Sequence, residues 1–284
     1  MPRRSPACLA AVISAVLTLG TGTSVRASAA TISRCAGFDP EALLVRARQA
    51  FRARPQPPYV VYTITRRETV AGVPDFDMTY RNRVWFRTAD GAALTRRMKG
   101  AGAGGALVFE RPRFNAPLDP GPPTADIFQP APVLPRVSKE DDPASPLREI
   151  GRVSAHVETD YHASILSCDA STVHLALHPR RDPDRNRLRD LWIDRATFAV
   201  RRFVATDRLY LADTDIWNPD IADATLQLSG NTPLVTVIHM VADTDGGPEV
   251  SDYRFEDISF PSVLPNWYFE PQTYGEHRAD APTQ

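Results

Sequence analysis

The sequence has few of the residues that usually mark an enzyme or a metal site. It contains 3 cysteines and 6 histidines among 284 residues, and it lacks the Gly-x-Ser-x-Gly motif of a nucleophile elbow. His174 and His178 have the spacing of a helical metal motif, but on a strand they would lie about 13 Å apart. One ion cannot bind both histidines at that separation. We therefore predict no catalytic residues, no metal site and no cofactor.

A nucleotide-binding loop is also missing, although one glycine cluster has its spacing. Gly100, Gly102 and Gly105 match the dinucleotide-binding pattern, which requires a buried strand before the glycines and a helix after them. The charged stretch 96–99 precedes the cluster, and the apolar stretch 107–109 that follows has the pattern of a strand. The sequence predicts a hairpin loop here.

Long apolar runs are confined to the first residues of the chain. Arg3 and Arg4 precede an apolar run from Leu9 to Gly20, which is shorter than the about 20 residues of a membrane span. The small residues Ala27-Ser28-Ala29 follow it. This arrangement predicts a signal peptide over residues 1–30, cleaved near Ala29 or Ala30, and a periplasmic or secreted protein. An uncleaved anchor is the alternative.

A basic excess is absent as well. Without residues 1–30 the chain has 30 basic and 34 acidic residues. Proteins that bind nucleic acid usually carry a basic excess or a basic stripe. We therefore expect no nucleic acid among the partners.

Cleavage would leave two cysteines, Cys35 and Cys168, with a single possible connectivity. An oxidising compartment favours a disulfide between them, and the long loop that it closes would stabilise the fold by roughly 4–5 kcal/mol. We predict this pairing. Two buried, unpaired thiols are the alternative, because the sequence gives no distance between the residues.

One helix is predicted near the start of the mature chain. Asp39 is a suitable N-cap, Pro40 suits the first helical position, and Pro55 ends the run. Apolar residues recur between them at helical spacing, namely Leu43, Leu44, Ala47 and Phe51.

Most of the remaining chain alternates as β-strands do. The alternation predicts strands around 60–64, 78–87, 92–98, 153–157, 173–177, 188–194, 198–203, 233–242 and 250–260. Turn signals at Asp90-Gly91, Asp182-Pro183-Asp184 and Asp194–Thr197 separate several of them. Short turns between neighbouring strands favour an antiparallel meander. We predict one mainly β (α+β) domain over residues 31–284, with a flexible tail from about residue 276.

Residues 111–147 break this pattern. Their ten prolines rule out a central strand, and a loop this long is usually functional or disordered. The apolar pairs Ile127-Phe128 and Val133-Leu134 give the segment residues with which to dock. We predict a mobile flap outside the main fold, with plain disorder as the alternative.

The stretch from Val173 to Phe198 is the most specific pattern in the chain. It reads VHLALHPRRDPDRNRLRDLWIDRATF, in which the strand segment Leu191-Trp192-Ile193-Asp194 lies between two turns. This arrangement resembles the central hairpin of the LolA/LolB-like family of outer-membrane lipoprotein-sorting proteins, which is related to the RseB-type periplasmic sensors. The order of signal peptide, helix and meander is similar too. The resemblance implies an open, strongly curved antiparallel sheet, an incomplete barrel, with helices over its concave face and a hydrophobic cavity for acyl chains.

The resemblance predicts an exported, non-catalytic carrier that binds a lipid or the acyl chain of a lipoprotein. One alternative is an RseB-like sensor or adaptor that binds a periplasmic or outer-membrane protein, and another is an exported enzyme of unknown chemistry. No position matches the family's acyl-chain-controlling arginine. Two interpretations are open for four arginines, which are either charges at the rim of the cavity or ordinary solvent-exposed side chains. They are Arg66, Arg67, Arg96 and Arg97.

Apolar residues on neighbouring strands are predicted to line the cavity, and filling a solid core is the alternative for them. They are Val60, Tyr62, Ile64, Met78, Tyr80, Val84, Phe86, Leu94, Val173, Leu175 and Leu177.

Overall fold

A computed structural model describes residues 35–73, 77–100, 107–110, 120–130, 160–183, 185–211, 216–229, 232–244 and 247–280. The predicted signal peptide, the predicted strand at 153–157 and the apolar pair Val133-Leu134 lie outside these ranges. Within them, no helix is both long and apolar enough to cross a membrane.

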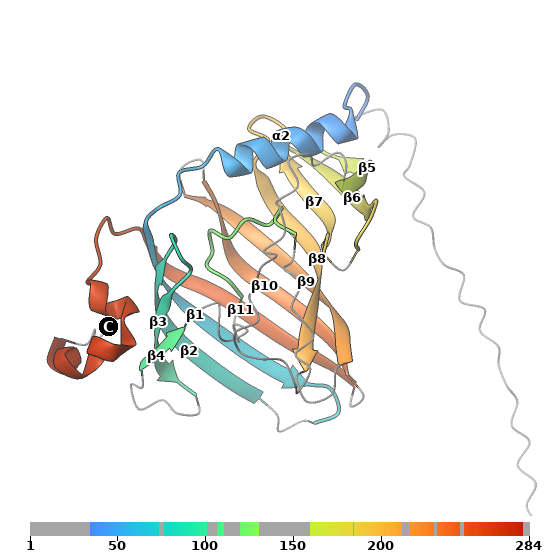
Figure 1. Cartoon of the computed structure of the whole chain (residues 1–284). Helices are drawn as coiled ribbons and strands as arrows, with labels where there is room; N and C mark the ends of the chain where they lie inside the picture. Colours follow the sequence, from blue (N-terminus) through green and yellow to red (C-terminus); the bar gives the residue numbers. More distant parts are fainter. Residues whose placement is uncertain are drawn as a thin grey trace, which may run out of the picture.

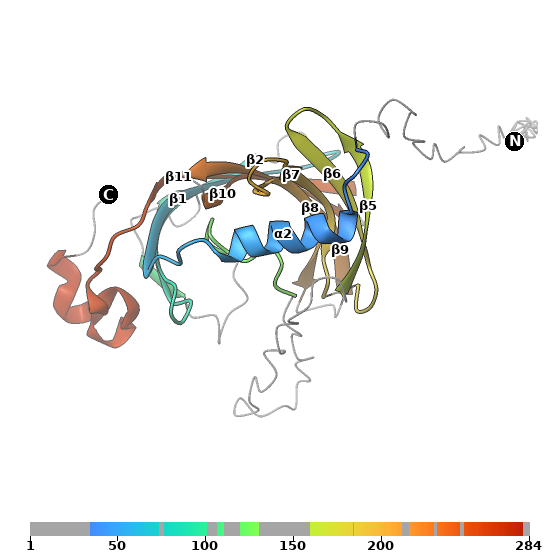
Figure 2. The ribbon, with the colours of Figure 1, turned by 90° about the horizontal axis from the view of Figure 1, so that it is seen from above.

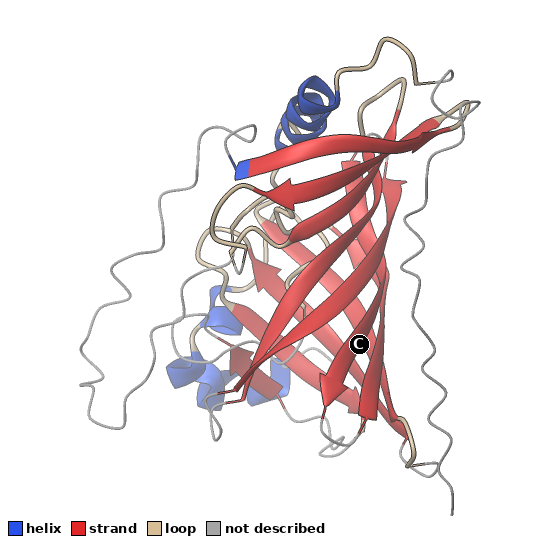
Figure 3. Cartoon of the chain, turned by 90° about the vertical axis from the view of Figure 1, so that its right-hand side faces the viewer, coloured by secondary structure: helices blue, strands red, loops and turns tan. Residues whose placement is uncertain are grey.

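One sheet of eleven antiparallel strands makes up most of the described structure (Figures 1 and 3). The strand order is β4-β3-β2-β1-β11-β10-β9-β8-β7-β6-β5. Two meanders, β1 to β4 and β5 to β11, are therefore joined where β1 pairs with β11. The sheet is open and strongly curved, which confirms the predicted fold class. The strands are β1 (Tyr59–Val70), β2 (Asp77–Arg87), β3 (Ala93–Lys99), β4 (Leu107–Glu110), β5 (Tyr161–Cys168), β6 (Thr172–Pro179), β7 (Leu188–Asp194), β8 (Val200–Leu211), β9 (Ile216–Ser229), β10 (Thr232–Thr244) and β11 (Gly247–Ser259).

Local sequence signals predict many of these strands and turns correctly. The connection between β2 and β3 contains Asp90-Gly91, and the turn after β7 is closed by Asp194, whose Oδ1 accepts from the Ala196 and Thr197 amides at 3.1 and 3.0 Å. β3 and β4 pair on either side of residues 101–106, which confirms the hairpin predicted for the glycine cluster. β5 and β9 have no counterpart among the predicted strands.

The predicted helix is present as α2 (Pro40–Arg52), and it lies across the concave side of the sheet (Figure 2). Asp39 caps the helix as predicted, because its Oδ1 accepts a hydrogen bond from the Glu41 amide at 3.0 Å. The buried apolar side chains of α2 are Leu43, Leu44, Ala47 and Phe51. They share one core with residues from both meanders, including Val60 on β1 and Leu175 on β6. α2 thus covers part of the concave face with packed side chains.

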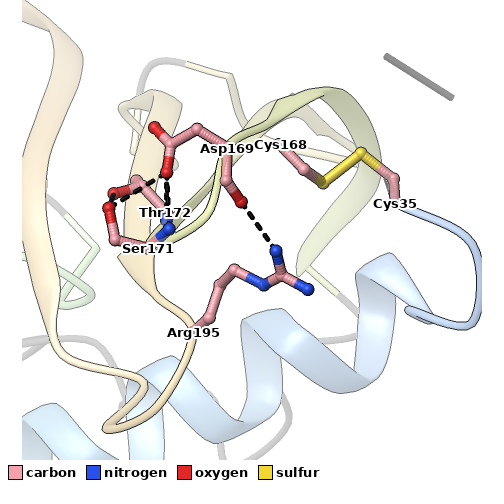
Figure 4. Close-up of a disulfide and its surroundings, with 6 residues drawn as sticks. All are labelled: Cys35, Cys168, Asp169, Ser171, Thr172 and Arg195. Atoms are coloured by element: carbon pink, nitrogen blue, oxygen red, sulfur yellow. Dashed lines mark hydrogen bonds between the residues drawn. A yellow bond between two sulfur atoms is a disulfide. The ribbon is translucent and has the colours of Figure 1, made fainter. Parts of the chain in front are cut away.

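A disulfide joins the start of α2 to the sheet, as predicted (Figure 4). Cys35 precedes the helix and Cys168 ends β5, and their Cα atoms lie 5.6 Å apart. The alternative of two unpaired thiols does not apply to this structure.

The turn after Cys168 also holds the amino-terminal end of α2 against the sheet. The Asp169 carboxylate accepts from the Ser171 and Thr172 amides, both at 2.7 Å, and these hydrogen bonds lower its pKa. Arg195 donates to the Asp169 carbonyl at 2.6 Å (Figure 4) and lies 4.9 Å from the ring centre of Phe38, just before α2. The amino-terminal end of the helix is therefore held both by the disulfide and by this turn.

Residues 120–130, which belong to the predicted flap, dock inside the fold. Phe128 is 6% exposed, and its ring meets the Phe51 ring edge-on with the centroids 5.6 Å apart. For these residues the prediction of a flap outside the fold is wrong, because the apolar pair Ile127-Phe128 completes the core beside α2. The rest of 111–147 lies outside the described ranges.

Arg54 connects the end of α2, the docked segment and β10. Its guanidinium lies 3.8 Å from the ring centre of Phe51 and donates to the carbonyls of Ala125 and Pro233, both at 3.1 Å. Burial lowers the pKa of Arg54 to about 10, and the charge of Asp126 partly offsets this effect. Arg54 therefore remains charged at neutral pH while it anchors the segment.

A second, smaller core lies on the convex face, where the segments η1 (Asn266–Phe269) and η2 (Pro271–Asp280) pack. Leu94 pairs in register with Trp85, and both join Val61 and Trp267 in this cluster. The prediction that Leu94 lines the concave face is therefore wrong. His277 stacks on Trp267 with ring centres 5.2 Å apart, so the chain stays packed beyond residue 276, where a flexible tail was predicted to begin.

Candidate functional site

The concave face carries two continuous rows of side chains across six neighbouring strands, from β8 to β2. Residues that pair directly in an antiparallel sheet point to the same side, so the register defines each row. The first row is Phe203, Ala224, Ile238, Tyr253, Arg66 and Tyr80. The second row is Ala205, Ala222, Met240, Ser251, Glu68 and Met78. Each row is apolar over β8 to β10 and carries a charged side chain on β1, Arg66 in the first row and Glu68 in the second.

Most of the residues predicted to line a cavity lie beneath α2 in the main core. Among them Val60, Val173 and Leu175 are 0% exposed. The buried members of the predicted set are Val60, Tyr62, Ile64, Val84, Val173, Leu175 and Leu177. In this structure α2 fills the space above them, so a ligand would reach these residues only if the helix moved.

The apolar part of the two rows is less covered than the core under α2. Phe203, Ala205, Ile238 and Met240 are only partly buried, although they contact the main core. Ala222 is half-buried beside them. Alanine leaves room above a sheet that larger residues would fill. We call these five residues the apolar floor.

Charged and hydroxyl groups adjoin the apolar floor. An Arg66 Nη2 lies 2.8 Å from Glu68 Oε2 and 3.9 Å from Glu249 Oε1. Burial raises the pKa of the Glu249 carboxyl, and both the charge of Glu68 and a hydrogen bond with it add to that rise, against the opposing effect of Arg66. Ser251, which pairs with Glu68 in register, is 1% exposed, and its hydroxyl has no hydrogen-bond partner within the described ranges of the chain. We call Arg66, Glu68, Glu249 and Ser251 the polar end.

The remaining predicted lining residues on this face are Met78 and Tyr80, beside the polar end, and Phe86, which pairs with Val60 at the other end of β1. Met78 and Tyr80 are half-buried, and the Tyr80 hydroxyl donates to the Met78 sulfur at 3.1 Å. Phe86 is half-buried on the same face, against the main core. Arg97 lies 5.0 Å from the ring centre of Tyr80. The face thus combines aromatic surfaces with charged groups.

The four arginines considered in the sequence divide between the two faces. Arg66 and Arg97 lie on the concave face with the partners described above, whereas Arg67 and Arg96 pair with convex-face positions of neighbouring strands. Simple solvation therefore does not describe Arg66, whose side chain is 21% exposed.

The described residues contain no group of three or more His, Cys, Asp or Glu that could hold a metal ion. His174 lies on β6, as predicted, where it contacts Asp190 at 2.8 Å and stacks on Trp192 with ring centres 3.9 Å apart. A hollow of about 210 Å³ lies at the ends of β9, β10 and β11, lined by residues such as Leu234 and Phe260. It is smaller than the about 300–1,000 Å³ typical of ligand pockets.

The sequence did not predict the apolar floor. Of the polar end, it singled out only Arg66. Ala222 and Ala224 alternate with Asp223 and Thr225, which is a strand signal within an acidic segment. The polar end had no local signal, because Glu68 and Glu249 are far apart in sequence and meet only through the pairing of β1 with β11.

Three solved structures are similar in overall chain path. They are a LolA superfamily protein from Nitrosomonas europaea, a DUF1329 family protein from Desulfovibrio piger and a domain named for outer-membrane lipoprotein sorting from Vibrio parahaemolyticus. The identities are 16%, 12% and 11%, and each TM-score is 0.41. The matches cover 82%, 83% and 81% of this chain and 98%, 99% and 97% of theirs.

Two of these names come from the group that the Val173–Phe198 hairpin resembles. A TM-score of 0.41 is too low to carry an argument about function. No protein-family model matches the sequence, and no curated protein is significantly similar to it.

Proposed function

We propose that this protein is an exported, non-catalytic carrier that binds the acyl chain of a lipid or lipoprotein along the concave face of its sheet. The apolar floor carries this proposal, because it leaves partly buried apolar and small side chains beside α2 and ends at a polar group. An acyl chain on the floor would lie with its head towards Ser251.

Burial of the chain would drive binding. Each buried methylene contributes about 0.8 kcal/mol, so about ten of them would contribute about 8 kcal/mol. Association costs about 4–15 kcal/mol, which leaves little for a single chain bound by burial alone. Contacts at the polar end, or a second acyl chain placed under α2, would supply the remaining binding free energy.

The attachment of α2 is compatible with such a second chain. Its amino-terminal end is tied covalently through Cys35. Its carboxy-terminal end is held by polar contacts, including an ion pair of 2.8 Å between Arg52 and Asp126 and the hydrogen bonds of Arg54. Displacing this end would open the core over Val60, at the start of β1, without breaking the disulfide.

The proposed compartment is the periplasm or the exterior. The signal-peptide pattern of residues 1–30 supports export. A disulfide between Cys35 and Cys168 supports an oxidising compartment.

Analysis of co-purifying lipid tests the carrier function. The full chain would be expressed in an exporting bacterium and purified without detergent, and bound lipids would be extracted and identified by mass spectrometry. We expect acyl-containing lipids in stoichiometric amounts, and we expect the stripped protein to take up added lipid. A protein that carries no lipid and takes none up would overturn the proposal.

A further inference from the structure

When Glu68 and Glu249 are both ionised, the polar end carries one more negative charge than positive charge. Two carboxyl groups, those of Glu68 and Glu249, contact a single guanidinium, that of Arg66. The side chains of Glu68 and Glu249 are 11% and 26% exposed, so water screens them little. Buried charges are stable only when they are paired and hydrogen-bonded. An additional positive group would complete this cluster.

Two hydrogen-bond donors at the same place are also unused. The Ser251 hydroxyl and the Arg66 Nε are buried and have no hydrogen-bond partner among the residues that the structure describes. A buried donor without an acceptor has lost its hydrogen bond to water and gained none in return, which is unfavourable. The hydroxyl of Ser251 is in register opposite Glu68, so an acceptor that reached it would lie beside the carboxyl groups.

From this arrangement, and resting on the proposed carrier function, we propose that the polar end binds a zwitterionic head group. Its ammonium group lies against Glu68 and Glu249, and an oxygen next to it accepts from Ser251 and from Arg66. The ligand is then an amphiphile of the phosphoethanolamine type, with its acyl chain on the apolar floor.

Other head groups fit the cluster less well. A purely anionic head would bring negative charge beside two carboxyl groups, and a neutral head would leave their excess charge unpaired. The raised pKa of Glu249, caused by burial and by Glu68, is consistent with a missing cation. The nearby Arg97 contacts other groups, because its Nε donates to Asn82 at 3.3 Å and its guanidinium lies over Tyr80.

Two lysolipids with the same acyl chain and the same phosphate test this assignment. Lysophosphatidylethanolamine carries an ammonium group and lysophosphatidylglycerol does not. Binding of each would be measured below its micelle concentration by displacement of a fluorescent fatty acid from the mature, disulfide-bonded protein. We expect the ethanolamine lipid to bind about tenfold more tightly, the size of one charge-assisted hydrogen bond.

Three variants define the source of that preference. Glu249→Gln should abolish it. Glu256→Gln is the matched control, because Glu256 lies on the same strand with its exposed side chain on the convex face, and it should keep the preference. Ser251→Ala should weaken both lipids equally, since both carry the acceptor oxygen.

The outcomes separate the two proposals. Equal binding of the two lipids by the parent protein, or tighter binding of the glycerol lipid, would overturn the zwitterionic head group and leave the carrier function intact. A preference that persists in folded Glu249→Gln protein would overturn it as well. If neither lipid nor the fluorescent fatty acid binds, the carrier function itself fails.

Discussion

Cys35 and Cys168 are 133 residues apart in the sequence, and their Cα atoms lie 5.6 Å apart. The disulfide therefore closes a loop that contains β1 to β5 and all of α2. This covalent link fixes one end of the helix that covers the concave face. The other contacts that hold α2 over the concave face are side-chain packing and polar interactions, which thermal motion can break.

Replacing both cysteines with serine should destabilise the protein strongly. A loop of this length contributes up to about 5 kcal/mol in the chain-entropy model, and each kcal/mol corresponds to about 2–4 °C in Tm. Thermal unfolding of the double variant checks the value. Labelling of the parent under denaturing, non-reducing conditions should find no free thiol, and two labelled thiols would contradict the pairing.

Phe128→Ala should loosen residues 120–130 and destabilise the core. The variant removes the ring that meets Phe51, and such truncations typically cost about 3–5 kcal/mol. Chemical denaturation measures the loss, and limited proteolysis should cut the segment faster. Gln129→Ala, at an exposed neighbouring position, is the control and should change neither property. Unchanged stability of Phe128→Ala would mean that the segment does not dock.

Glu249→Gln should raise Tm at neutral pH. Because burial and Glu68 raise the pKa of Glu249, the stability that this group contributes is present at low pH and is lost as the pH rises through its folded pKa. Removing the charge should restore that stability at pH 7, by about 2–4 °C for each kcal/mol. The gain should vanish below about pH 4, where the carboxyl is protonated in both states. A variant less stable than the parent at pH 7 would contradict an excess of negative charge at the polar end.

Asp194→Asn should show the opposite pH dependence. The hydrogen bond from Arg201, followed by that of the Thr197 amide, lowers the pKa of Asp194 to about 2. The contribution of Asp194 to stability is therefore fully present above its unfolded pKa of about 3.9, and it is lost as the pH falls towards 2. Denaturant unfolding at several pH values should show the variant less stable at pH 7, with the difference shrinking below about pH 4. A difference that stays constant to pH 2 would contradict this assignment.

Elements with local signals could be predicted from the sequence. α2 has a capping aspartate, a proline at its first position and apolar residues at helical spacing, and each of these features acts within a few residues. The turn at Asp194 is similarly local, because one carboxylate binds the amides just after it. The hairpin resemblance rests on this same part of the chain.

Elements defined by long-range contacts could not be predicted. β9 contains Pro219, which argues against a central strand, yet pairing with β8 and β10 overrides that preference. Leu94 has the apolar character of a lining residue, but the distant Trp267 gives it a second core on the convex face. The polar end likewise depends on β1 meeting β11 from the other end of the chain.

One measurement tests the carrier function most directly: fluorescent fatty-acid binding and thermal unfolding of Ala222→Phe protein. Phenylalanine at this half-buried position should fill the apolar floor. We expect saturable binding by the parent, at least about tenfold weaker binding by the variant, a change of about 1.4 kcal/mol, and a nearly unchanged Tm. Ala176→Phe, at a half-buried alanine on the convex face of β6, should bind like the parent. If the floor is instead a close-packed core, overpacking should cost about 1–3 kcal/mol and lower the Tm. A lowered Tm of this kind, or a parent protein that binds no fatty acid, would contradict acyl-chain binding on the apolar floor.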